Sequence, residues 1–109
     1  MGTRSMISIK NQDGTYDGVY CHFDGYPRGV GSTLKTSYTT EDKIRQLIAG
    51  GAMSCLVEEV DDCEFYTKRG EDLHNYKELE LDVLRKKAKN IGCEYLYTFQ
   101  DNKWSHLEI

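Results

Sequence analysis

The residues best able to do chemistry stand in one run of eight, Tyr20-Cys21-His22-Phe23-Asp24-Gly25-Tyr26-Pro27. This run joins a thiol, an imidazole and a carboxylate to three aromatic rings and the only proline of the chain. The β-branched and aromatic content of residues 19–23 predicts a strand, and Gly25 with Pro27 predicts its end. Alternate side chains of a strand share a face, so His22 and Asp24 should project together, as a general base and its orienting carboxylate do.

Zinc binding is a second chemistry that these residues offer, because thiolates and imidazoles are preferred zinc ligands in sets of four. No secretory pattern is visible, so the cysteines are predicted to be reduced or metal-bound and not paired in disulfides. The paired C-x2-C spacing of many zinc sites is absent, and neighbouring residues such as Cys21 and His22 leave a regular strand on opposite faces. The sequence is compatible with one structural zinc site, whose candidate ligands are Cys21, His22, Cys55 and Cys63. Cys93 is assigned to the core.

Catalysis is the alternative function, with Cys21 or Cys63 as a nucleophile and Arg69 with Asp72 as an anion-binding pair. The sequence has no glycine-rich phosphate loop, no H-x-x-x-H pair and no nucleophile elbow. Structural roles account for some of the same residues, since Asp24 suits a turn and Arg69 suits an ion pair with a neighbouring carboxylate. We therefore predict that the protein is not an enzyme. His22 and Asp24 are the catalytic candidates under the alternative, a small metal-dependent or Cys/His enzyme.

Negative charge is concentrated in residues 58–72, which we call the acidic segment. The segment carries two basic side chains, Lys68 and Arg69, against seven carboxylates, a net charge of −5. The seven are Glu58, Glu59, Asp61, Asp62, Glu64, Glu71 and Asp72. The whole chain, with a formal charge of −4, is also acidic, and this disfavours direct binding to nucleic acid. Such a segment is either a solvated face or a surface that bonds to a basic protein partner.

The elements that position these residues begin with a β-hairpin. Strands at residues 6–10 and 15–23 flank Asp13-Gly14, a pair that favours the positive φ angles of a type I′ turn. A spacing of four between buried positions then predicts a short helical piece that carries Val30, Leu34 and Tyr38 on one stripe. The chemically rich run therefore connects the hairpin to the first helix.

Two further helices and three further strands are predicted. One helix begins at Thr39-Thr40-Glu41-Asp42, ends at Gly50-Gly51 and buries Ile44, Leu47 and Ile48. The other is long, from about Leu73 to Asn90, and its buried stripe consists of Tyr76, Val83, Leu84, Ala88 and Ile91. A strand over residues 63–67 lies between them, and strands at 93–99 and 103–109 surround Asp101-Asn102.

The sum is a single α+β domain over residues 1–109, with a mainly antiparallel sheet of about five strands and two to three helices on one face. With 109 residues and 39% hydrophobic composition, the chain suffices for one core. No apolar run approaches the ~20 residues of a membrane span, and the N-terminus lacks the pattern of a signal peptide. The sequence thus predicts a cytoplasmic protein without a membrane partner.

Motifs spread over nearly the whole chain carry a resemblance to a known group of proteins. They are the MGTRS start, CHFDGYP with the Gly29-Val30-Gly31 that follows, Phe65-Tyr66 with the RGED of residues 69–72, and Glu94-Tyr95-Leu96-Tyr97 with Trp104. In these motifs the chain resembles a family of small uncharacterised proteins that phages and prophages carry. The family has no established common chemistry, so the resemblance implies a phage origin and leaves the activity open.

In size and acidity the chain is also similar to phage anti-CRISPR proteins that inhibit type II effector nucleases, some of which are metalloproteins. This likeness implies an inhibitor that binds a host RNA-guided CRISPR effector nuclease in the bacterial cytosol and blocks its binding or cleavage of target DNA. The implied contact surface is the acidic segment, which would face the basic channels of such a nuclease. The implied cofactor is a structural zinc ion, and the implied assembly is a monomer or weak dimer. Another binding protein that modulates host defence is the remaining alternative.

Overall fold

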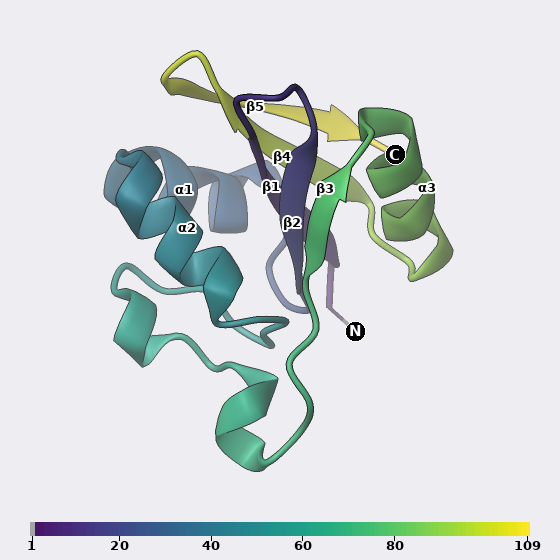
Figure 1. Ribbon diagram of the computed structural model, residues 1–109. Helices are drawn as coiled ribbons and strands as arrows, with labels where there is room; N and C mark the ends of the chain where they lie inside the picture. Colours follow the sequence, from purple (N-terminus) through teal and green to yellow (C-terminus); the bar gives the residue numbers. More distant parts are fainter. Residues whose placement is uncertain (1) are drawn as a thin grey trace.

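A five-stranded mixed sheet forms the centre of the molecule (Figure 1). The computed structural model describes residues 2–109, so Met1 of the MGTRS motif lies outside the described residues. The strands are β1 (Ser5–Lys10), β2 (Tyr16–Cys21), β3 (Tyr76–Leu79), β4 (Tyr95–Gln100) and β5 (Lys103–Glu108). They lie in the order β3-β2-β1-β4-β5, with β1 parallel to β4 and every other pair antiparallel. The predicted α+β class and mainly antiparallel sheet are confirmed.

Two hairpins supply four of the strands, and their connections differ. Between β4 and β5, Asp101 and Asn102 both have positive φ, 52° and 64°, and they form a tight two-residue turn at the predicted place. Between β1 and β2 the register leaves a five-residue loop and not the predicted type I′ turn. The Asp13 carboxylate shapes this wider loop, because it accepts the Thr15 backbone N–H at 3.0 Å.

Helices cover both faces of the sheet, not the single face that the sequence predicts (Figure 1). They are α1 (Ser32–Ser37, preceded by a π-helical turn at Pro27–Gly31), α2 (Glu41–Ala49) and α3 (Leu81–Asn90). α1 and α2 pack on one face, and α3 packs on the other. The reason lies in β1, where the consecutive residues Met6 and Ile7 are both fully buried and point to opposite faces. A strand that is apolar on both sides requires a cover on both sides.

The first two helices follow their sequence signals. α2 begins after Thr40, whose hydroxyl accepts the Lys43 backbone N–H at 3.3 Å, as expected of an N-cap. Both predicted apolar stripes are buried, namely Val30, Leu34, Tyr38, Ile44, Leu47 and Ile48. None of the helices in the described part of the chain is long and apolar enough to cross a membrane.

The predicted strand over residues 63–67 is wrong. A 3-10 turn at Val60–Asp62 precedes this stretch, and a second one, Tyr66–Arg69, begins within it. Backbone hydrogen bonds join residues 64–66 to residues 52–55, but they form one isolated bridge, between Phe65 and Met53. Lone bridges do not extend a sheet, so this stretch lies outside the sheet as a loop.

The predicted long helix from Leu73 to Asn90 is wrong in its first half. Residues 76–79 form β3, an edge strand that pairs with β2, and α3 begins at Leu81. The predicted stripe divides accordingly, with Leu84 and Ala88 buried and Val83 and Ile91 exposed. The fifth strand of the sheet is therefore β3, and it lies where the sequence predicts a helix.

Candidate functional site

The acidic segment lies at one end of the molecule, between α2 and β3, and consists mainly of loop and short 3-10 turns (Figure 1). All seven predicted partner-binding carboxylates are exposed: Glu58, Glu59, Asp61, Asp62, Glu64, Glu71 and Asp72. Within residues 2–109, one of them makes an ion pair, Glu71 with Arg69 at 3.6 Å. The other six carboxylates therefore stand on this part of the described surface without an ion-pair partner.

Two nearby lysines bond to backbone carbonyls and not to carboxylates. Lys43, on α2, donates from Nζ to the carbonyl of Glu58 at 2.7 Å. Lys68 donates to the carbonyl of Cys63 at 2.7 Å and also to the carbonyl of Asp61. The ammonium groups thus tether the main chain of the acidic segment, and they leave its carboxylate side chains to the solvent.

Buried side chains hold the acidic segment from beneath. The Tyr38 hydroxyl donates to the Val57 carbonyl at 2.7 Å and lies 3.5 Å from the Cys63 sulfur. That sulfur accepts the Val57 backbone N–H at 3.4 Å, and the thiol lies 3.5 Å from the Glu59 carbonyl. The side chains of Tyr38 and Cys63 are fully buried, and burial raises the pKa of the Tyr38 hydroxyl above its usual value. Because the main chain of this loop is already fixed, binding a partner costs little further backbone conformational entropy.

Replacing Tyr38 by Phe should weaken this anchorage. The change removes the short hydrogen bond to the Val57 carbonyl and leaves it only the weak Cys63 thiol donor at 3.7 Å, so we expect the free energy of unfolding to fall by about 1–2 kcal/mol. Thermal unfolding should show a melting temperature lower by roughly 5–10 °C, and amide hydrogen exchange should accelerate at residues 57–63. Tyr95→Phe is the matched control, because the half-buried Tyr95 hydroxyl makes no hydrogen bond within the described residues. An equal effect in the control would contradict the anchoring role.

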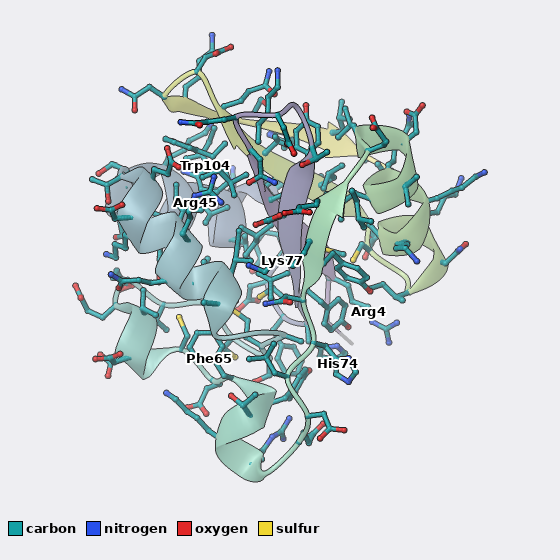
Figure 2. The ribbon with its side chains drawn as sticks, in the orientation of Figure 1. Arg4, Arg45, Phe65, His74, Lys77 and Trp104 are labelled. Carbon is teal, nitrogen blue, oxygen red and sulfur yellow. The ribbon has the colours of Figure 1, made fainter. Side chains whose placement is uncertain are left out.

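A groove lined by three tyrosines borders the acidic segment. Its volume is about 360 Å³, and its walls are Tyr20, Ala52, Tyr66, Glu71, His74, Tyr76 and Ile91. The Arg69 guanidinium lies 4.7 Å from the centre of the Tyr66 ring. His74 projects from the stretch that leads into β3 (Figure 2). Glu71 belongs both to the groove and to the acidic segment, so the two form one continuous surface.

His22 and Asp24 lie just beyond the end of β2, but the structure does not join them. The His22 Nδ1 shares a hydrogen bond of 2.7 Å with the Tyr20 hydroxyl, and the Asp24 carboxylate accepts one of 3.2 Å from Tyr26. Over residues 2–109, no hydrogen bond links the imidazole to the Asp24 carboxylate. The φ angle of Asp24 is 59°, so its backbone leaves the extended path on which a shared face was predicted. The orienting contact of His22 is therefore a tyrosine and not the carboxylate.

The four cysteines are free thiols; Cys21, Cys63 and Cys93 are buried, and Cys55 is half-buried. Cys21 lies in the core beneath α1 and α2, whereas its neighbour His22 bonds to Tyr20 on the α3 side of the sheet. The Cys21 thiol lies 3.6 Å from the Phe23 carbonyl, and burial raises its pKa to about 12, so the thiolate is disfavoured. In the described chain, no three His, Cys, Asp or Glu side chains are placed to hold one metal ion. The candidate ligands Cys21, His22 and Cys63 thus bond to other groups of the chain and do not converge on one point, and zinc binding stays a prediction.

A chelator tests the zinc prediction. A structural ion contributes its binding free energy to folding, so its removal lowers the melting temperature. The predicted zinc site requires excess EDTA to lower the melting temperature, whereas cysteines that only contact backbone carbonyls, as Cys21 and Cys63 do in this structure, leave it unchanged. A fall of more than about 5 °C that added zinc reverses and magnesium does not would show that these thiols rearrange around a metal ion.

One polar cluster has no counterpart among the sequence predictions. Asp17, in β2, is buried, and one carboxylate oxygen accepts the Asn11 side-chain amide and the Glu78 backbone N–H, each at 2.9 Å. Arg45 of α2 and Lys77 of β3 each lie 3.6 Å from its other oxygen; Figure 2 shows these two side chains. Burial alone would raise the pKa of Asp17, but the hydrogen bonds and the two cations hold it below its usual value. The cluster ties α2 and the edge strand β3 to β2. The one sequence signal for it is an acidic residue in an otherwise apolar strand.

The fold and the surface of residues 2–109 define a small α+β protein with an acidic segment whose main chain is tethered by two lysines. The chain matches no protein-family model, and comparisons with curated proteins and with solved structures find no similar protein. Its function is therefore inferred from its own residues and from the motif resemblance described above.

Proposed function

We propose that the protein acts by binding a basic protein surface through the acidic segment. The observation that carries this proposal is that six exposed carboxylates of the acidic segment have no ion-pair partner within residues 2–109, while Lys43 and Lys68 bond to main-chain carbonyls beside them. Carboxylates that only keep a domain soluble need no such tethering. Carboxylates held on a fixed main chain form charge-assisted hydrogen bonds to Arg and Lys at a smaller entropic cost.

The tyrosine-lined groove supplies the second part of an interface. Hot spots of protein interfaces are enriched in Tyr, Trp and Arg, and they lie inside a polar rim. Here Tyr20, Tyr66 and Tyr76 line the groove, and Glu71 joins it to the acidic segment. An apolar or aromatic side chain of the partner fits the groove, while neighbouring basic side chains of the partner meet the carboxylates.

The partner we propose is an RNA-guided effector nuclease of a type II CRISPR system, and the protein is its phage-encoded inhibitor. The motif resemblance to phage proteins and the likeness in size and acidity to anti-CRISPR proteins support this choice. Such nucleases hold nucleic acid in positively charged channels. An acidic surface of fixed geometry competes for the same cationic side chains, so binding of target DNA is the step that we expect to be blocked.

A pull-down tests the proposal. The purified protein is presented to a panel of guide-loaded type II nucleases, and capture, DNA binding and DNA cleavage are scored in the same samples. Stoichiometric capture with loss of DNA binding supports the inhibitor. Capture with DNA binding intact supports the binding role and contradicts the blocked step, whereas no capture with full cleavage across the panel contradicts the nuclease as partner. Guide RNA and target DNA without nuclease serve as controls, since an acidic chain is not expected to bind them.

A further inference from the structure

The two edge strands of the sheet are protected to different degrees. Edge strands expose unpaired N–H and C=O groups, and proteins guard them with short strands, bulges and charged side chains. β3 has all three: it is four residues long, its pairing with β2 is irregular between Tyr16 and Gly18, and Lys77 and Glu78 stand at its centre. The φ of Glu78, 54°, distorts this edge further. The opposite edge, β5, is longer and regular, and its charged side chains, Lys103 and Glu108, stand only at its two ends.

β5 is a regular edge strand of six residues. It pairs with β4 along its whole length without a shift of register, and its four inner residues, Trp104-Ser105-His106-Leu107, carry no formal charge when the histidine is neutral. Because Gln100 and Lys103 close a two-residue turn, Lys103 and every second residue after it bond to β4. The residues between them point their backbone N–H and C=O groups away from the sheet, and these are Trp104, His106 and Glu108.

We infer that β5 pairs with β5 of a second copy of this chain, in an antiparallel two-fold dimer with one continuous sheet. The three outward-pointing residues are symmetric about His106. A two-fold axis there sets His106 opposite the partner's His106 and Trp104 opposite the partner's Glu108. This register joins every outward N–H and C=O of β5 to the other copy. Two-fold dimers are the commonest protein assemblies, and they require a surface that is complementary to itself.

The surroundings of β5 leave room for the second copy. α3 packs against β2 and β3, and Leu107, on the same face as α3, is 48% exposed. On the other face the Trp104 indole donates to the Tyr38 carbonyl at 2.8 Å, and the His106 ring packs 5.5 Å from the Tyr97 ring. α1 also contacts β5, but residue 103 and residues 105–108 of the strand are exposed, so these neighbours leave its outer edge accessible. The inference is independent of the proposed function, because β5 and the acidic segment lie at different ends of the molecule (Figure 1).

Cysteine cross-linking tests the register. Across the two-fold axis the Cα atoms of residue 106 would lie about 5.5 Å apart, within the range of a disulfide, so His106→Cys should form a linked dimer under mild oxidation. Ser105→Cys is the matched control, because residue 105 points to the other face and has no symmetry mate opposite it. We expect His106→Cys to link at least ~10-fold faster than Ser105→Cys or the wild-type chain with its four cysteines. Faster linking of Ser105→Cys would place the axis elsewhere and overturn the inference.

Sedimentation equilibrium gives an independent measurement. The mass of the wild-type chain should rise with concentration from 12.5 kDa toward twice that value, since one strand pair makes a small interface. His106→Pro removes an N–H that makes no bond to β4, so this variant should stay folded and monomeric, whereas His106→Ala should still dimerise. A mass of 12.5 kDa up to about 1 mM would contradict the dimer. The inference would also be contradicted by a dimer that His106→Cys does not cross-link and that His106→Pro does not dissociate.

Discussion

Reversing the charge of four carboxylates in the acidic segment is expected to lower the affinity for the partner by at least about 100-fold. The four, each changed to Lys, are Glu58, Glu59, Asp61 and Asp62. All are exposed and have no ion-pair partner in the described chain, so no basic side chain of the same molecule has to be displaced before the partner binds them. The change replaces attraction to the partner's cationic groups by repulsion. Isothermal titration calorimetry with the nuclease that the panel identifies measures the loss.

The fold should tolerate this change. The contacts from Lys43 and Lys68 use backbone carbonyls of the acidic segment, which the substitutions leave in place. We therefore expect the melting temperature to stay within about 3 °C of the wild-type value. The matched control has the same net charge and reverses four exposed carboxylates elsewhere, Asp42, Glu80, Asp82 and Glu94. An equal loss of affinity in the control would show that overall charge, and not the acidic segment, governs binding.

Local sequence signals predict the elements whose hydrogen bonds close within a few residues. At the start of α2, Thr40 accepts the N–H of Lys43, three residues on, and the helix lies where this signal predicts it. The turn at Asp101-Asn102 is a second such case. Exposure of the acidic segment is predictable as well, because carboxylates are rarely buried without a partner.

Features that depend on contacts between residues far apart in the sequence are not predicted from local sequence signals. Residues 76–79 lead into a run of strong helix formers, yet Glu78 donates its N–H to Asp17 in β2, and the segment joins the sheet. Lys43 bonds to the Glu58 carbonyl, whereas a count of charges would pair it with a carboxylate. The Asp17 cluster and the tethered acidic segment are both built from such contacts. Composition predicts the carboxylates of the acidic segment but not the tethering of its main chain, and it predicts nothing of the Asp17 cluster.

Asp17→Ala is expected to lower the free energy of unfolding by about 2–4 kcal/mol, because two donors in a largely buried site lose their acceptor. The donors are the Asn11 amide and the Glu78 N–H, and loss of the second releases the edge strand β3. Asp17→Asn separates the hydrogen bonds from the charge, since its amide oxygen still accepts both. That variant should lose only about 1 kcal/mol, because Arg45 and Lys77 are 36% and 58% exposed and solvent screens them. Urea unfolding of both variants measures the difference.

The charge of Asp17 should also make stability depend on pH. Its folded-state pKa lies below the ordinary value of 3.8, so as pH falls the carboxylate of the unfolded chain takes up its proton first. Its contribution is therefore complete well above pH 3.8 and is lost as pH falls toward the lower folded pKa. The difference in unfolding free energy between wild type and Asp17→Asn should shrink between about pH 5 and pH 3. A difference that stays constant over this range would show that Asp17 acts through its hydrogen bonds alone and that Arg45 and Lys77 do not stabilise its charge.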